Sequence, residues 1–307
     1  MSEPALPASA PWLAASRAEV VDRAQHWLAS AALAELIGQL GGPDPAQADA
    51  RTLRDWSAES LDTRRGAERR EARATDWDAA WIDPLLHSAR PLGLVATATP
   101  VLPAYDVGLL LGGATTGNRL RTQLAANLMQ SGVTFAELVA LTAARPLSPG
   151  ELRSEPDSAN DTTEWQNLSR YLHRYFGPLQ SDTISTGGDS TQAWREENLV
   201  GLDGDKLRLT VAPSPTAQSR ATTSDAVCFY LTRTPKDRRA SILIITSSIY
   251  APYQFFTVAP LLLDAGVAHA ELVGTPTAQD DSKRLAQRVA QEIHAAIEAA
   301  SRLLISS

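Results

Sequence analysis

The chain has 307 residues, of which 44% are hydrophobic and 21% are charged. These proportions are typical of a globular protein and exclude wholesale disorder, and the length predicts two regions of about 150 residues each. The net charge of −7 argues against broad nucleic-acid binding, which needs a cationic surface.

Residues 1–11 are rich in Pro, Ala and Ser and lack the cationic start and apolar core of a signal peptide, so we expect a disordered tail. No apolar run approaches the ~20 residues that span a bilayer. We therefore expect a cytoplasmic protein without a membrane or nucleic-acid partner. The single cysteine, Cys228, cannot form an internal disulfide, and no Cys/His spacing suits a zinc site. The sequence predicts no metal and leaves the cofactor unknown.

Residues 12–90 are expected to form a helical region. Apolar residues recur at helical spacing over 12–40 and stop at Gly41-Gly42-Pro43, and a helical pattern continues over 45–88. The segment 51–73 is dense in Arg, Glu and Asp, which is typical of a solvated helix face. Alternatively, one of four arginines there meets an anionic ligand: Arg64, Arg65, Arg69 or Arg70. The region is open to interpretation as a lid, a dimer contact or a packing support, so a homodimer stays among the options.

Residues 91–307 alternate short apolar runs with helical stretches. The expected strands are 106–111, 137–141, 207–211, 241–245 and 270–273. The expected helices are 119–130, 162–176, 223–231, 253–263 and 281–304. This alternation predicts a parallel sheet covered on both faces. We therefore predict an α/β fold, a Rossmann-like three-layer sandwich with a mostly parallel sheet, in which 181–205 forms a loop excursion.

The loop after the first strand is the first candidate ligand site. In an open parallel sheet, ligands bind beyond the carboxyl ends of the strands, where helices begin. Glycines let the backbone approach a ligand, and hydroxyl and guanidinium groups add donors. The predicted substrate-binding residues here are Gly112, Gly113, Thr115, Thr116, Asn118 and Arg119. The loop lacks the dinucleotide and P-loop fingerprints, and a tight turn with a helix cap is the alternative.

Two further candidate loops follow the second and third strands. Arg145 would hold a phosphate, with Glu151 behind it as a general base or metal ligand, unless this is an exposed loop. Arg220 and Thr222 would bind substrate at the start of the helix that follows, with Asp225 as an alternative base. Helix capping by Thr222 explains part of this pattern without a function.

The fourth candidate loop follows the most β-like run of the chain. Thr246 and Ser247 end the strand, and Tyr250 and Tyr253 lie near the start of the next helix. This pattern is typical of a pocket wall, in which Tyr250 would act as an acid, or of a tyrosine-rich interface. None of the five histidines lies at a predicted strand end, so the sequence does not support a Ser–His–Asp triad.

The four loops in this order resemble the SanA/ElyC/YdcF family of bacterial proteins over about residues 104–275. The shared pattern comprises an Asp, an apolar strand, Leu-Gly-Gly and an Arg-bearing helix, as in 106–119, then an acidic residue matched by Glu151. Ser219, Thr222 and Ala226 match the family's Ser-x-Asn-Thr-x-Glu-Asn-Ala. The strand end Ile245-Thr246-Ser247 matches its Val-Thr-Ser. The resemblance implies a Rossmann-like domain.

The chain departs from that pattern at several polar positions. Ala221, Ser224 and Asp225 stand where the family has Asn, Glu and Asn, and Tyr250 and Tyr253 stand at its His and Arg. These exchanges motivate one alternative, a non-catalytic binding or sensor module that has lost the family chemistry.

Our leading sequence-based hypothesis is an enzyme, a transferase or hydrolase, that acts on a phosphorylated or nucleotide-like small molecule. Arg119 and Arg220 would hold the anion, and Glu151 or Asp225 would be the general base. Thr246, Ser247 and Tyr250 would orient or protonate the substrate. A third hypothesis is S-adenosylmethionine-dependent methyl transfer, and the sequence leaves open whether any reaction occurs.

Overall fold

The computed structural model describes residues 11–44, 47–63, 77–158, 160–189, 192–202, 204–216, 221–277 and 281–305. The fold is α/β with a mostly parallel sheet, as predicted. The chain forms two compact units. Unit 1 comprises Met1–Ala98, Ser248–Pro260 and Pro276–Ser307, and unit 2 comprises Thr99–Ser247 and Leu261–Thr275. The C-terminal segment thus groups with the N-terminal helices, and not with the α/β region to which the sequence pattern assigned it.

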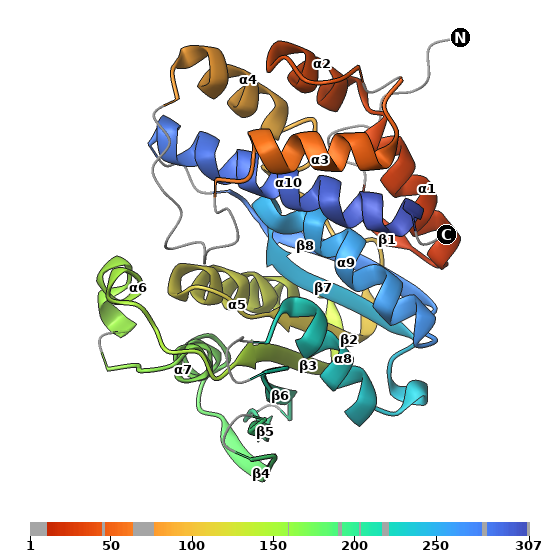
Figure 1. Ribbon diagram of the computed structural model, residues 1–307. Coiled ribbons are helices and arrows are strands. Elements are labelled where there is room, and N and C mark those ends of the chain that lie inside the picture. Colours follow the sequence, from red (N-terminus) through yellow and green to blue (C-terminus); the bar gives the residue numbers. More distant parts are fainter. Residues whose placement is uncertain are drawn as a thin grey trace. The chain divides into compact units, whose positions relative to one another are not determined.

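Unit 1 is mainly helical. Its elements are β1 (Trp12–Ala14), α1 (Arg17–Leu28), α2 (Ala31–Gln39), α3 (Ala50–Ser60), α4 (Ala79–Ala89), η4 (Ser248–Tyr250), most of α9 (Ala251–Asp264) and α10 (Ser282–Ile305). The long helix α10 packs against α1, α3 and α4 (Figure 1). The Trp12 ring lies against the rings of Phe255 and Phe256, with centroids 5.5 and 5.8 Å away. Across the described ranges, no helix is long and apolar enough to cross a membrane.

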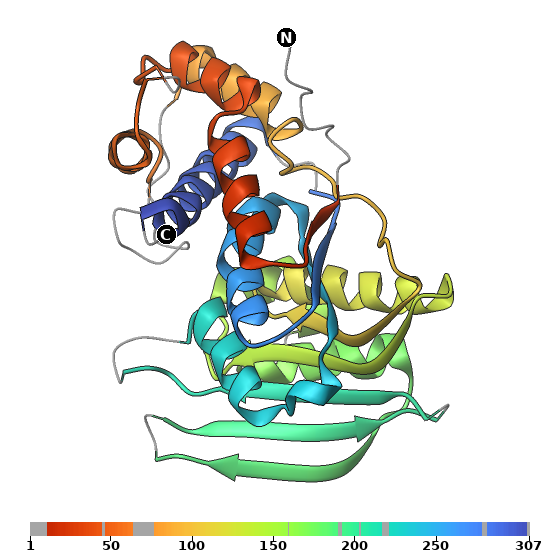
Figure 2. The same ribbon diagram turned by 90° about the vertical axis from the view of Figure 1, so that its right-hand side faces the viewer.

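Unit 2 is built on a sheet. Its strands are β2 (Ala104–Leu111), β3 (Thr134–Ala143), β4 (Gln180–Gly187), β5 (Trp194–Val200), β6 (Lys206–Ala212), β7 (Ser241–Ser247) and β8 (His269–Thr275). They lie in the order β8-β7-β2-β3-β6-β5-β4, as Figure 2 shows. The strands from β8 to β6 run parallel, and β6, β5 and β4 pair antiparallel.

Helices cover both faces of this sheet. They are α5 (Thr115–Gln130), α7 (Glu164–Phe176) and α8 (Thr223–Arg233), whereas the short α6 (Pro149–Ser154) packs against α5. Leu207 and Leu209 of β6 share a core with residues of α5 and α7, which pack side by side. Arg208 lies between them in the strand and therefore points to the other face, where it bonds Thr234 after α8. Unit 2 is thus a three-layer sandwich.

The register brings several strand ends to one edge. Leu111 of β2 pairs with Leu141 of β3, Leu110 pairs with Ile245 of β7, and Ala143 pairs with Ala212 of β6. The loops that follow β2, β3, β6 and β7 therefore leave the sheet at the same carboxyl edge. This is the edge at which parallel sheets bind ligands.

The expected loop excursion at 181–205 is instead a β-hairpin, formed by β4 and β5. Each residue of β4 is exposed except the half-buried Gly187, and the Ile184 side chain is 51% exposed. The hairpin is held by backbone pairing and by polar contacts such as Asn198 Nδ2 to Thr183 Oγ1 at 2.7 Å. A strand without a buried face lacks the alternation of apolar and polar residues by which strands are recognised in a sequence.

Candidate functional site

The Gly112-Gly113 loop leads from β2 into α5. The Gly112 amide donates to the Leu141 carbonyl oxygen at 2.7 Å, and the Gly113 amide donates to Asn118 Oδ1 at 2.8 Å. The helix begins at Thr115, and within the described residues no side chain caps its first turn. The amides of that turn therefore present the positive end of a 16-residue helix at the carboxyl edge.

Arg121 lies beneath this loop and is only 3% exposed. Its Nη1 donates to the carbonyl oxygens of Leu111 and Gly112 at 2.5 and 2.8 Å, and its Nε donates to Ser247 Oγ at 3.1 Å. Arg121 is not among the site residues predicted from the sequence. Its position along the helix could have indicated that it is buried. Arg121 lies three residues after the buried Asn118 and four before the buried Ala125, so all three share one face of α5.

Arg145 follows β3 and binds two carboxylates. Its Nη1 and Nη2 donate to Glu151 at 2.9 and 2.7 Å, and its Nε donates to Glu164 Oε2 at 2.8 Å. Glu164, at the start of α7, also accepts from Thr142 Oγ1 at 3.0 Å. The buried Glu164 therefore fixes the orientation of Arg145, and the two carboxylates together more than offset its single positive charge.

The Glu151 carboxylate is ionised and hydrogen-bonded to its neighbours. Burial by itself would raise the pKa of its carboxyl, but hydrogen bonds from Arg145 and from Ser148 lower that pKa to about 2. The Ser148 amide and hydroxyl donate to the Glu151 carboxylate at 2.9 and 2.8 Å, and the Ser148 hydroxyl accepts from the Glu151 amide, which completes the capping box of α6. A carboxylate with so low a pKa is a poor general base near neutral pH, so these contacts do not suit the base role expected for Glu151.

Arg119 also meets a carboxylate from the same segment. Its Nε donates to both oxygens of Glu155 at 2.9 and 3.1 Å. One turn earlier, Thr115 Oγ1 donates to the Glu151 carbonyl oxygen at 3.0 Å and lies 3.4 Å from Ser154 Oγ. The segment that carries α6 thus lies against the first turn of α5.

A buried polar network supports the base of the site. Asn118 Nδ2 donates to Asn167 Oδ1 at 3.0 Å, and Asn167 Nδ2 donates to Ser158 Oγ and Asp161 Oδ2 at 2.7 and 3.0 Å. Arg170 forms an ion pair with Asp161. The network links α5 to α7 and to the chain before α7, which gives the surrounding residues a rigid frame.

The third predicted loop is described only in part. Arg220 and Ser219 lie outside the described residues. Thr222 and Asp225 cap α8: the amide and hydroxyl of Thr222 donate to Asp225 Oδ2 at 2.8 and 2.7 Å. Both residues follow β6 at the carboxyl edge, but their described contacts are those of a helix cap.

The fourth predicted loop divides between the units. Ser247 belongs to unit 2 and contacts Arg121, and the buried Thr246 lies beside it on β7. Tyr250 and Tyr253 belong to unit 1, where both are half-buried. The four arginines proposed at 64, 65, 69 and 70 lie outside the described residues.

Unit 2 therefore brings part of the predicted set together. The predicted residues in the loop, in the first turns of α5 and in the linked segments are Gly112, Gly113, Thr115, Thr116, Asn118, Arg119, Arg145, Glu151 and Ser247. The additional residues that the structure supplies are Arg121, Glu155, Glu164 and Asn167. Over the described ranges, no group of three His, Cys, Asp or Glu residues is placed to hold a metal ion.

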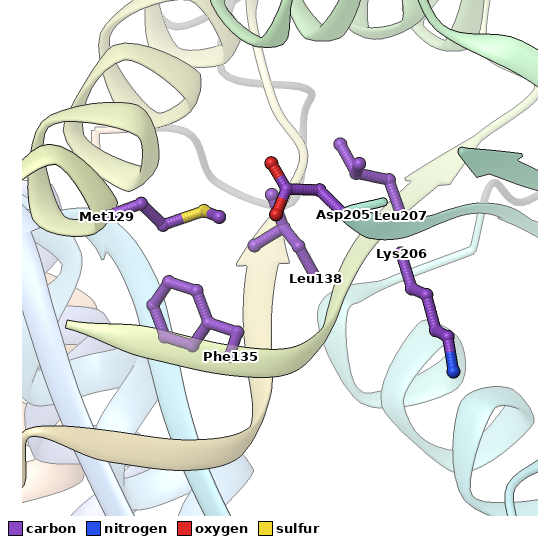
Figure 3. A pocket seen from close by; sticks show the side chains of 6 residues that line it. All are labelled: Met129, Phe135, Leu138, Asp205, Lys206 and Leu207. Atoms are coloured by element: carbon purple, nitrogen blue, oxygen red, sulfur yellow. The ribbon is translucent and has the colours of Figure 1, made fainter. Parts of the chain in front are cut away.

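One hollow of unit 2 lies away from this edge. It is lined by Met129, Phe135, Leu138, Asp205, Lys206 and Leu207 (Figure 3). Phe135 and Lys206 lie at the amino ends of β3 and β6, opposite to the candidate site. In Figure 3 the Lys206 side chain extends away from the other five. The hollow does not include any of the predicted site residues.

Comparisons with known proteins relate the chain to mycobacterial proteins. A family described as the Rv3785 N-terminal domain matches residues 13–93. The chain is 27% identical over 325 aligned residues to the uncharacterized protein Rv3785 of Mycobacterium tuberculosis, and equally so to the uncharacterized protein Mb3814 of Mycobacterium bovis. Each alignment covers 94% of this chain and 90% of the relative. No solved structure matches the chain significantly. The resemblance to the SanA/ElyC/YdcF family stays a prediction, and the similarity found is to the uncharacterized proteins Rv3785 and Mb3814.

Proposed function

We propose that unit 2 binds a phosphorylated or nucleotide-like small molecule at the carboxyl edge of its sheet. The observation that carries this proposal is the position of Arg145, which Glu164 orients beside the Gly112-Gly113 loop. Arg145 Nη2 lies 3.5 Å from the Gly113 carbonyl oxygen, at the start of a helix whose first turn is positively polarised. Arginine presents two parallel donors that match a phosphate or carboxylate.

Binding without turnover is the version that the described contacts favour. Glu151 forms an ion pair and Asp225 caps a helix, so both expected bases have structural partners. Transfer or hydrolysis of a group stays the second version, because the Ser247 and Thr142 hydroxyls lie at the same edge. The two versions differ in whether the bound molecule is released unchanged.

Ligand-induced thermal stabilisation tests the proposal. The panel would contain pyrophosphate, ATP, GTP, glucose 6-phosphate and citrate, and we expect at least one phosphate compound to raise the melting temperature of the native protein. The Arg145→Gln variant should lose that increase, because the bidentate donor is gone. The matched control is Arg174→Gln, whose ion pair with Asp157 is exposed and outside the site.

Mass spectrometry of the incubated ligand then separates the two versions. An unchanged ligand after prolonged incubation supports a binding module, and a product supports an enzyme. If no member of the panel stabilises the native protein, the proposed function is wrong.

A further inference from the structure

Residues 148–155, which we call the strap, connect two parts of unit 2 that are fixed by hydrogen bonds. On one side, the Leu147 amide donates to the Thr162 carbonyl oxygen at 3.0 Å. On the other, Ser158 is fully buried and accepts from Asn167 Nδ2. The ends of the strap are therefore fixed, whereas its middle is the short helix α6.

The strap is held mainly by polar contacts. All six residues of α6, which lies wholly in the described part, are exposed or half-buried. The strap contacts the rest of unit 2 through Glu151 on Arg145, Glu155 on Arg119 and the hydrogen bonds of Thr115. A segment with little buried apolar surface opens at low free-energy cost. Competing ions would weaken its charged contacts directly.

The two acids of the strap occupy the guanidinium groups that an anionic ligand would need. Both carboxylate oxygens of Glu151 accept from Arg145, and both carboxylate oxygens of Glu155 accept from Arg119 Nε. Arg145 does not depend on Glu151 for its orientation, because the buried Glu164 holds its Nε. A ligand oxyanion that replaced Glu151 would therefore meet an arginine already in position.

The strap also covers the start of α5. Thr115, the first residue of that helix, is 1% exposed and bonds the strap backbone. Displacement of the strap would uncover the Thr115 hydroxyl, the first-turn amides of α5, Arg119 and Arg145 together. All four are groups that bind phosphate in proteins.

We infer that the strap is an autoinhibitory cover whose carboxylates stand in for the anionic groups of the ligand. The ligand class is a molecule with two phosphate groups or a diphosphate, which takes the places of Glu151 and Glu155 and releases α6. This inference rests on the proposed function and adds to it the ligand class and a regulatory step.

The test uses the full chain with Glu151→Gln and Glu155→Gln combined. Glutamine keeps the capping box of α6, so the change removes charge while preserving the local fold. The matched control is Asp157→Asn, which removes an exposed ion pair two residues beyond the strap. The probe is pyrophosphate, with its dissociation constant measured by calorimetry. A second readout is trypsin cleavage after the exposed Arg153, quantified by mass spectrometry.

The double variant should bind pyrophosphate at least tenfold more tightly than the native protein and the control. Without ligand, it should be cleaved after Arg153 several-fold faster, and pyrophosphate should accelerate this cleavage in the native protein. Equal or weaker binding by the double variant, with native binding intact, overturns the strap inference alone, as does an unchanged cleavage rate. Absence of pyrophosphate binding in both proteins, with no thermal shift from any other compound of the panel, overturns the proposed function as well.

Discussion

Arg121 on α5 donates from Nε to Ser247 Oγ at the end of β7, and from Nη1 to the carbonyl oxygens of Leu111 and Gly112. One buried side chain thus ties a helix, a strand end and the glycine loop into a single arrangement. We expect the stability of the candidate site to depend on this buried residue more than on the half-buried Arg119 and Arg145.

Replacing Arg121 with Met should therefore destabilise the protein. We expect a loss of about 4–5 kcal/mol in the free energy of unfolding, because three hydrogen bonds are lost and each bond to a charged group contributes roughly 1.5 kcal/mol or more. Ser247→Ala, which removes only one of the three partners, should cost roughly 1.5–3 kcal/mol. Urea denaturation followed by circular dichroism measures both, and a loss below that of Ser247→Ala would contradict the expected order.

The two neighbouring glycines of the loop should respond differently to alanine. A Cβ on Gly112 would lie 2.5 Å from the Leu141 carbonyl oxygen, whereas a Cβ on Gly113 would lie 3.2 Å from Arg121 Nη1. The backbone of β3 cannot move aside, whereas the hydrogen-bonded Arg121 guanidinium needs to shift by only a few tenths of an ångström. Gly112→Ala should cost roughly 3 kcal/mol and Gly113→Ala less than about 1 kcal/mol. Melting temperatures of the two variants test the ranking, and equal values would refute it.

Acid should weaken the contact between the strap and Arg145. The pKa of Glu151 is about 2 in the folded protein and rises to its ordinary value near 4.5 on unfolding. A lowered folded pKa gives stability that is present above pH 4.5 and is lost as the pH falls towards 2. We expect this loss to amount to roughly 1–2 kcal/mol after solvent screening. Glu151→Gln should flatten the stability curve in this window, and a curve parallel to that of the native protein would contradict the assignment.

The hairpin should tolerate change on its outer strand but not at its junction with the core. Leu199 of β5 is 2% exposed and shares a core with Leu207, whereas Ile184 of β4 is 51% exposed. Leu199→Ala should therefore cost about 2–4 kcal/mol, as expected for a buried leucine. Ile184→Ala should change the free energy of unfolding by less than about 1 kcal/mol. Chemical denaturation of the two variants provides the comparison.

The parallel core could be predicted because its strands are continuous apolar runs. DVGLLL at 106–111 and SILII at 241–245 have no polar face, which is typical of strands covered on both sides. The hairpin of β4 and β5 could not be predicted in this way. In β4, polar residues such as Asp182, Thr183 and Ser185 do not alternate with buried apolar residues. The outer strand β4 is stabilised by backbone pairing with β5, which leaves no periodic pattern in the side chains of β4.

The candidate site was predictable in location but not in its contacts. The end of β2 and the end of β3 were identified because parallel strands place such loops at one edge. That Arg145 would bind Glu164, 19 residues away, depends on where α7 begins relative to β3. Local sequence indicates which residues carry charge, whereas the balance of charges around each arginine is set by the tertiary structure.

Unit 1 is assembled from three separate chain segments, so its folding depends on helices that are synthesised far apart in time. The helices α1, α3 and α4 pack on α10, which follows them in the chain by about 190 residues or more. Ribosomes must therefore synthesise all of unit 2 and then α10 before these earlier helices gain their main apolar neighbour. A fragment restricted to residues 13–93, the stretch shared with the Rv3785 N-terminal domain, would lack that neighbour and would need the C-terminal helix supplied as a separate peptide to form a native core.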